Sequence, residues 1–259
     1  MPQLDGSMPS SLLAISRTMR LGADVPALVV QPEGSSDGTA PCLLWMHGRT
    51  AKKELDPGRY LRLARAGIGS CSLDLPGHGE RFDPAAQHPE SVLATIEKAA
   101  NELDDVLIDL GRRGEFDLNR IAIGGMSMGG MAALLRLCRP NRFRAAILEA
   151  ASGSWSHQVH RQFFDEKTVA QIDPLLHLEG WREIPLLAVN SRNDEWVSWK
   201  GQEVFLDALK ARYHDPSQIE TLLLERTGAQ FEHIGFGTET NTVRVREIEF
   251  LCTHLLGAE

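Results

Sequence analysis

The pentapeptide Gly125-Met126-Ser127-Met128-Gly129 constrains the fold of this chain more than any other feature, because of the sequence on either side of it. Residues 119–125 are typical of a short buried strand, and residues 128–138 are typical of a helix. Ser127 therefore falls on a sharp turn from strand to helix, where its backbone is strained and its hydroxyl projects above the edge of a sheet. The glycines two positions before and after Ser127 allow the strand and the helix to approach closely.

The rest of the chain alternates between short apolar runs and helical patterns. The apolar runs are typical of strands buried on both faces of a parallel sheet, and they lie at 42–46, 68–73, 121–123, 145–148, 186–189 and 219–224. The predicted helices lie at 60–66, 92–112, 128–138, 199–213 and 243–256. Residues 12–20 and 25–31 instead alternate around residues 21–24, which predicts an antiparallel hairpin. The expected fold class is α/β, a mostly parallel central sheet with an antiparallel N-terminal edge and helices on both faces.

One segment does not fit this alternation. Residues 152–183 are polar, carry aromatic and His side chains, and fall between two predicted core strands. We expect them to form a short lid above the carboxyl edge of the sheet. A chain of 259 residues suits one α/β domain, so the prediction is a single domain over residues 1–259 with this insertion.

Composition disfavours several classes of function. The net charge is −8, and Lys and Arg are dispersed, so a nucleic-acid partner is not expected. The N-terminus lacks the basic and apolar parts of a signal peptide, and no apolar run approaches the roughly 18 residues of a membrane span, so we expect a cytoplasmic protein without a membrane partner. There is no Gly-rich phosphate loop and no metal-ligand spacing, so no cofactor and no metal is predicted.

Buried free thiols are expected for the four cysteines, Cys42, Cys71, Cys138 and Cys252.

A serine hydroxyl becomes a useful nucleophile only when a base takes its proton and a carboxylate orients that base. Asp194 follows the apolar run 186–189 and is the predicted carboxylate; its alternative role is a helix cap or an exposed turn residue. Glu149, after the run 145–148, is the reserve acid. His233 is the predicted base because it is the one His in the loop after residues 219–224. The other His residues lie in helices or precede the expected acid.

The oxyanion of a tetrahedral intermediate needs two backbone donors. The N–H of Met128, which follows the predicted nucleophile at a helix N-terminus, is the first. The second is expected from the turn after residues 42–46, with Arg49 the first choice and Thr50 the next. His47, on the same turn, comes too early in the chain to be the base, and we expect it to hold loops together by hydrogen bonds.

Large aromatic residues near these turns are candidates for the substrate pocket. The candidates are Trp155, Phe163 and Phe164 in the predicted lid, Trp196 and Trp199 beside the predicted acid, and Phe82. Each could equally be packed in the core.

Taken together, these motifs resemble the α/β-hydrolase superfamily, near the dienelactone hydrolase and prolyl-oligopeptidase-type esterases. The resemblance covers nearly the whole chain from the first hairpin, and the motifs that carry it are His47-Gly48, residues 74–81, the Gly-x-Ser-x-Gly at 125–129, Asp173-Pro174, Asp194 and His233. One departure is the position of His233, five residues after Gly228, where the family usually has three. The Ser at position 127 argues against the branches of the superfamily whose nucleophile is Asp or Cys. The turn after residues 42–46 lacks the HGGG motif, which argues against one branch of lipases and esterases.

The resemblance therefore implies a serine carboxylesterase that hydrolyses small acyl esters through an acyl-enzyme, with Ser127, His233 and Asp194 as its triad. A peptidase or acylaminoacyl hydrolase of the prolyl-oligopeptidase type is an alternative, but the chain has no room for the propeller domain of those enzymes. A non-catalytic receptor or interaction protein of the same fold is a second alternative. Such proteins typically lose a triad residue, and all three positions are filled here.

Overall fold

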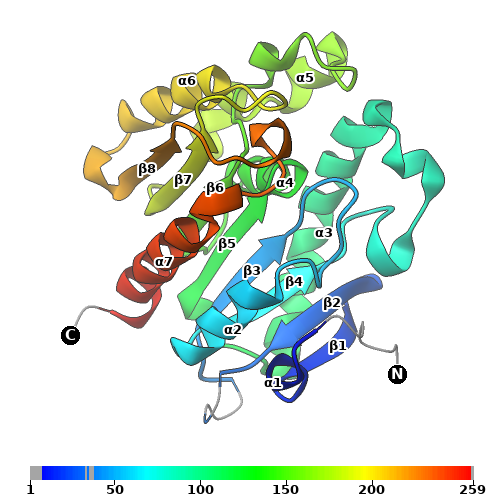
Figure 1. Cartoon of the computed structure of the whole chain (residues 1–259), viewed down its shortest axis with the longest axis vertical. Helices are drawn as coiled ribbons and strands as arrows, with labels where there is room; N and C mark the ends of the chain where they lie inside the picture. The colour runs from blue at the N-terminus through cyan, green and yellow to red at the C-terminus, as the bar shows by residue number, and fades with distance from the viewer. Residues whose placement is uncertain (1–7, 33, 35–37, 258–259) are drawn as a thin grey trace.

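The computed structural model describes residues 8–32, 34 and 38–257 and is built on one eight-stranded sheet (Figure 1). The strand order is β1-β2-β4-β3-β5-β6-β7-β8. β1 pairs antiparallel with β2, and β2 with β4, while every later pairing is parallel. The sheet confirms the predicted fold class, antiparallel N-terminal edge included. The strands are β1 (Ser16–Leu21), β2 (Val25–Val30), β3 (Cys42–Met46), β4 (Gly69–Leu73), β5 (Ile121–Met126), β6 (Ala145–Glu149), β7 (Leu186–Ser191) and β8 (Ile219–Leu224).

Helices cover both faces of the sheet. The α-helices are α1 (Ser10–Leu13), α2 (Pro57–Arg65), α3 (Val92–Arg113), α4 (Met128–Leu137), α5 (Glu166–Ile172), α6 (Trp199–Lys210) and α7 (Thr240–Leu251). One apolar cluster joins one face of the strands to α3, α4, α5 and α6, and a second joins the other face to α1, α2 and α7. Figure 1 shows α2 and α7 on the same side of the sheet. Within β3, Leu44 and Leu43 belong to opposite clusters, because successive side chains of a strand point to opposite faces.

The parallel register brings the carboxyl ends of β3, β5 and β6 to one edge. Met46 pairs with Gly125, and Met126 pairs with Glu149. The turns that follow these strands therefore gather at one end of the sheet, as do those after β7 and β8. Ligands of open α/β sheets bind at this end.

Some boundaries differ from the sequence prediction. The predicted first strand, residues 12–20, begins only at Ser16, because Ser10–Leu13 forms the short helix α1 with Leu12 fully buried. The predicted lid, residues 152–183, contains α5 and short 3₁₀ turns and remains a predicted lid. The prediction that the N-terminus is not a signal peptide falls largely on residues 1–7, which lie outside the described residues.

The cysteines match the expectation of free thiols. Cys42, Cys71 and Cys138 are buried, Cys252 is half-buried, and none forms a disulfide. No helix within the described ranges combines the length and the apolarity that a membrane span requires.

Candidate active site

Ser127 lies at the turn between β5 and α4, where the sequence predicts it. Its φ of 51° and ψ of −117° belong to a region that L residues rarely adopt. The N–H of Ser127 donates to the carbonyl oxygen of Glu149 at 2.8 Å, and its own carbonyl accepts from Met131 at 2.9 Å. The strained backbone is therefore held by β6 on one side and by the first turn of α4 on the other.

The two glycines of the pentapeptide are required by close backbone contacts. A Cβ atom on Gly125 would lie 2.5 Å from the carbonyl carbon of Gly129, and one on Gly129 would lie 2.3 Å from the carbonyl oxygen of Met46. Both distances are shorter than any that a real Cβ atom keeps from a non-bonded backbone atom. Gly125 thus allows α4 to start directly above β5, and Gly129 allows α4 to approach the turn after β3.

The imidazole of His233 lies between Ser127 and Asp194. Its Nε2 atom is 2.9 Å from the Ser127 Oγ, and its Nδ1 atom is 2.7 Å from the Asp194 Oδ2. The His233 side chain is 4% exposed and the Asp194 side chain is fully buried, so water does not compete for the second contact. The three residues predicted from the sequence are thus joined by two hydrogen bonds.

Two backbone amides hold the Asp194 carboxylate in place. Its Oδ1 atom accepts from the N–H of Trp196 at 2.8 Å and from that of Val197 at 2.7 Å. Because Oδ1 is engaged in this turn, Oδ2 remains directed at the imidazole. One oxygen of Asp194 therefore caps a turn while the other contacts His233, and the role of this carboxylate in catalysis stays a prediction.

The loop that carries His233 is longer than the family pattern and has an unusual backbone. Phe231 and Glu232 both adopt positive φ, 58° and 48°. The Glu232 carboxylate accepts from the N–H groups of Thr227 and Gly228, at 2.7 and 3.0 Å. These bonds tie the extra residues back onto the start of the loop, so that the insertion does not displace His233.

The turn after β3 lies beside Ser127. The Ala51 N–H donates to the Gly48 carbonyl at 3.3 Å, and Thr50 has a φ of 64°, so residues 48–51 form a tight turn. The Cβ position of Gly48 is 3.6 Å from the Ser127 Cβ. This places the backbone at Arg49 and Thr50, and the α4 N-terminus at Met128, on the wall of one cavity with Ser127. Which of Arg49 and Thr50 provides the second oxyanion donor stays a prediction.

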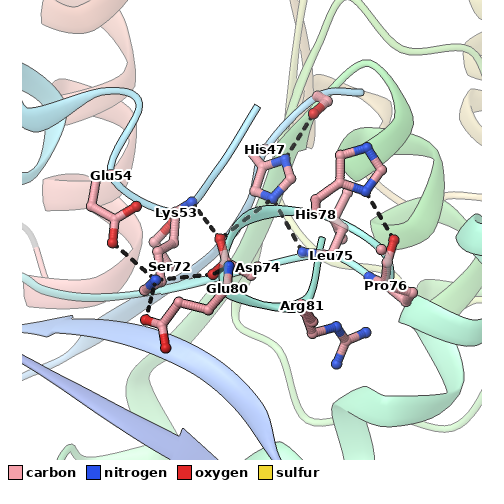
Figure 2. Close-up of polar contacts among 12 residues, drawn as sticks. His47, Lys53, Glu54, Ser72, Asp74, Leu75, Pro76, His78, Glu80 and Arg81 are labelled. Carbon is pink, nitrogen blue, oxygen red and sulfur yellow. Dashed lines mark hydrogen bonds and ion pairs between the residues drawn. The ribbon is translucent and has the colours of Figure 1, made fainter. Parts of the chain in front are cut away.

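His47 links this turn to the turn after β4 (Figure 2). Its Nδ1 atom is 2.7 Å from the Gly48 carbonyl oxygen, and its Nε2 atom accepts from the Leu75 N–H at 3.1 Å. A ring that donates from Nδ1 and accepts at Nε2 is neutral. Burial is the main cause that lowers the pKa of His47, to about 4, which agrees with this hydrogen-bond pattern. Both ring nitrogens of His47 are thus engaged in hydrogen bonds between loops, as the sequence analysis expected.

A buried lysine that the sequence analysis did not single out supports the same turns. Figure 2 shows Lys53 among three carboxylates, with its Nζ atom 2.9 Å from Asp74, 2.7 Å from Glu80 and 2.9 Å from Glu54. Burial alone would lower the pKa of Lys53, but these three acceptors raise it above its ordinary value. Asp74 also accepts from the N–H groups of Lys53 and Glu80, at 2.9 and 3.0 Å.

A cavity of about 470 Å³ adjoins Ser127 and His233. Its wall includes two of the predicted aromatic residues, Trp196 and Phe163. The Trp196 ring lies 5.0 Å from the His233 ring and stacks on Phe231 at the same distance between centroids.

The other four predicted aromatic residues are not on the wall of this cavity. Phe164 is partly buried and packs against the apolar core. Trp155 is fully buried in the core, where its Nε1 atom donates to the Ser152 carbonyl at 2.8 Å. Trp199 begins α6 and packs against the apolar core. Phe82 is 64% exposed on a surface turn. The positions of these side chains depend on packing, and closeness to the predicted acid in the sequence does not bring them to the cavity.

Glu149, the reserve acid, contacts arginines and not the imidazole. Its Oε1 atom accepts from Arg59 at 2.8 Å and from Arg244 at 2.5 Å, and both arginines also bond to Glu247 at 3.0 Å. Burial favours the neutral form of Glu149, but the charges of Arg244 and Arg59 outweigh it and lower its pKa to about 2. This buried cluster joins β6 to α2 and α7 behind Ser127. Its members lie up to 188 residues apart, so no local sequence pattern predicts the cluster.

No three His, Cys, Asp or Glu side chains are grouped as metal ligands anywhere in the described ranges. The wall of the cavity brings together the serine, the imidazole and the turn residues described above.

Comparison with protein families decides the assignment. Residues 43–238 match the model of the alpha/beta hydrolase family. This chain belongs to the α/β-hydrolase family. It is a hydrolase, and the resemblance expected from the motifs is confirmed.

Two relatives extend this comparison. This α/β hydrolase is 28% identical over 191 residues to esterase YjfP of Escherichia coli strain K12, covering 68% of the chain and 77% of YjfP. The crystal structure of TT1662 from Thermus thermophilus matches with a TM-score of 0.72 at 26% identity, over 94% of this chain and 99% of TT1662.

A third comparison concerns the fold alone. The acylaminoacyl peptidase of Pyrococcus horikoshii matches 94% of this chain with a TM-score of 0.73 at 17% identity. The match covers 42% of the peptidase, so this chain spans less than half of its length.

Proposed function

We propose that this protein is a serine carboxylesterase that hydrolyses small acyl esters through an acyl-enzyme. The observation that carries the proposal is the position of the His233 ring, 2.9 Å from the Ser127 Oγ and 2.7 Å from the Asp194 Oδ2, on the wall of a cavity of about 470 Å³. A hydroxyl, a base and an orienting carboxylate in this order are what nucleophilic acyl transfer needs.

In the proposed first step, the Ser127 Oγ attacks the ester carbonyl carbon while the His233 Nε2 takes the hydroxyl proton. The tetrahedral intermediate collapses as the bond from carbon to the alcohol oxygen breaks, and the alcohol leaves with the proton from His233. Water then attacks the acyl-enzyme and gives its proton to the same nitrogen. The acid departs, and Ser127 regains its hydrogen.

The oxyanion formed in both halves of the reaction needs donors already in place. Met128 is the first residue of α4, and the first four N–H groups of a helix have no partner within the helix. The turn at residues 48–51 borders Ser127 on the other side. We assign the two donors to the N–H groups of Met128 and Arg49, with Thr50 as the alternative to Arg49.

Two points favour an ester over other substrates. YjfP, which shares 28% identity with this chain, is named an esterase. The cavity wall is also largely apolar beside the serine, with Val92, Met131, Phe163 and Trp196, which suits a small acyl or alcohol group.

The test combines labelling with turnover. A fluorophosphonate probe should label Ser127, located by peptide mass spectrometry, and aryl esters of increasing acyl length should be hydrolysed with a burst of phenol. Matched aryl amides serve as the peptidase arm. Labelling mainly at another serine, or faster hydrolysis of amides than of esters, would overturn the proposal.

A further inference from the structure

Two arginines on the cavity wall beside Ser127 form no ion pair with a carboxylate of the described residues. Arg161 comes from the segment between β6 and β7, and Arg49 comes from the turn after β3. The guanidinium of Arg49 donates to the Gln87 carbonyl at 2.9 Å. That of Arg161 makes no hydrogen bond or ion pair with any described residue, although its side chain is half-buried.

The position of Arg161 relative to the reacting atoms is fixed through Trp196. The guanidinium carbon of Arg161 lies 5.8 Å from the centre of the Trp196 ring, and that ring lies 5.0 Å from the His233 ring. The Trp196 ring therefore lies close to both the Arg161 guanidinium and the His233 imidazole. A substrate held at Ser127 reaches it without leaving the cavity.

The charges of the two arginines act on each other. Burial and then the charge of Arg49 lower the pKa of Arg161, while the carboxylate of Asp194 opposes them. Asp194 does not form an ion pair with Arg161, since its oxygens are taken up by His233 and by two backbone amides. Among the described residues, the repulsion between the arginines is therefore offset only in part, by the charge of Asp194.

The other two arginines of the cavity wall have carboxyl partners. Arg59 and Arg244 each contact the carboxyl groups of Glu149, Glu247 and Asp56, all within 3.3 Å. The whole chain carries a net charge of −8, so a positive cavity wall is not a general property of its surface. Among the described residues of the cavity wall, Arg49 and Arg161 are therefore the arginines without a carboxylate contact.

We propose that Arg161 and Arg49 bind a carboxylate of the substrate, so that the preferred substrates are esters that carry this group on their acyl or alcohol half. The inference rests on the proposed function and names the substrate class of the same site. A carboxylate between two guanidinium groups accepts charge-assisted hydrogen bonds and removes their mutual repulsion.

The experiment compares esters that carry a free carboxylate with their uncharged methyl esters. On the acyl side, mono-p-nitrophenyl glutarate is compared with its methyl ester; on the alcohol side, p-acetoxybenzoate is compared with its methyl ester. The measurement is kcat/KM, corrected for spontaneous hydrolysis. The wild type should prefer the charged member of at least one pair by about tenfold to a hundredfold, and that pair identifies the half that carries the carboxylate.

The variants assign this preference to one side chain. Arg161→Gln removes the charge and should abolish most of the preference, while Arg161→Lys keeps the charge without the planar fork and should retain part of it. Arg192→Gln is the matched control, since Arg192 is an exposed arginine paired with Glu225 outside the cavity wall. Added salt should weaken the preference in the wild type and leave Arg161→Gln unaffected.

Equal kcat/KM for both members of both pairs in the wild type would overturn the inference, as would an undiminished preference in Arg161→Gln. These results leave ester hydrolysis itself in place. If the wild type hydrolyses none of the four esters, the proposed function fails and the inference fails with it.

Discussion

The Nε2 atom of His233 lies 2.9 Å from the Oγ of Ser127, although 106 positions separate the two residues. Ser127 follows β5 and His233 follows β8, and two further strands lie between β5 and β8 in the sheet. The loop after β8 therefore reaches back over the edge of the sheet. Its consecutive left-handed residues, Phe231 and Glu232, supply the sharp turn that brings the ring over the serine.

The first prediction concerns the proposed nucleophile. Ser127→Ala should lower ester turnover by roughly 10⁶-fold, because the attacking oxygen is lost while the turn keeps a small side chain. The melting temperature should stay near that of the wild type, which shows that the loss is chemical. Turnover within tenfold of the wild type in a folded variant contradicts the assignment.

The second prediction separates the two acids. Asp194→Asn should lower kcat by roughly 10⁴-fold with little change in stability, because an amide cannot hold His233 in the same tautomer with the same charge. Glu149→Gln should mainly lower the melting temperature, since it leaves the charges of Arg59 and Arg244 less compensated in a buried site. Thermal unfolding and kcat are measured on both variants. A large loss of kcat in folded Glu149→Gln, with Asp194→Asn active, would transfer the acid's role to Glu149.

The third prediction concerns the close approach of α4. Gly129→Ala should prevent folding or strongly destabilise the protein, because its Cβ would lie 2.3 Å from the Met46 carbonyl oxygen, an atom of a central strand. Gly58→Ala in α2 is the control, since its Cβ meets nothing closer than 3.7 Å, and it should be neutral or stabilising by up to about 1 kcal/mol. Chemical denaturation measures both. Equal stability of the two variants would show that the backbone at α4 yields easily.

The fourth prediction concerns His47. His47→Ala removes the donor to the Gly48 carbonyl and the acceptor for the Leu75 N–H, so the turn beside Ser127 loses its brace. We expect kcat for esters to fall by about tenfold to a hundredfold with a smaller change in KM, less than the loss of a whole oxyanion donor. His78→Ala is the control, because the Nδ1 of His78 bonds to the Pro76 carbonyl and not to this turn. A similar fall in kcat for both variants argues for general loosening of the loops.

The fifth prediction follows from the buried cluster. Burial and the charge of Glu149 raise the pKa of Glu247 to about 8, against about 4.3 for a Glu in an unfolded chain. Between these values the folded protein keeps a proton that the unfolded chain has released. The stability from this proton is complete below about 4.3 and is lost as the pH rises toward 8.

Glu247→Gln cannot titrate, so its melting temperature should fall less than that of the wild type between about pH 5 and pH 8, by a few degrees. Glu249→Gln, at a 61% exposed side chain on the same helix, should keep the wild-type dependence. Parallel curves for Glu247→Gln and the wild type would show that Glu247 does not hold the proton.

The sequence by itself determined the order of strands and helices and the position of Ser127 between β5 and α4. Both are encoded locally: apolar runs and helical periodicity extend over a few neighbouring residues, and the two glycines of the pentapeptide stand next to the contacts that need them. The expected positions of Asp194 and His233 followed from the same logic, because parallel strands bring their carboxyl ends to one edge.

Only the tertiary structure decided which side chains surround the serine. Trp155 and Trp196 are the same residue type near the same edge, yet one is fully buried in the core and the other lines the cavity. The contacts of Arg59 and Glu149 with α7, and the position of Arg161 on the cavity wall, likewise cannot be predicted from the neighbouring sequence. These outcomes depend on packing and charge pairing between segments tens to hundreds of residues apart, and no short window of sequence contains both partners of such a contact.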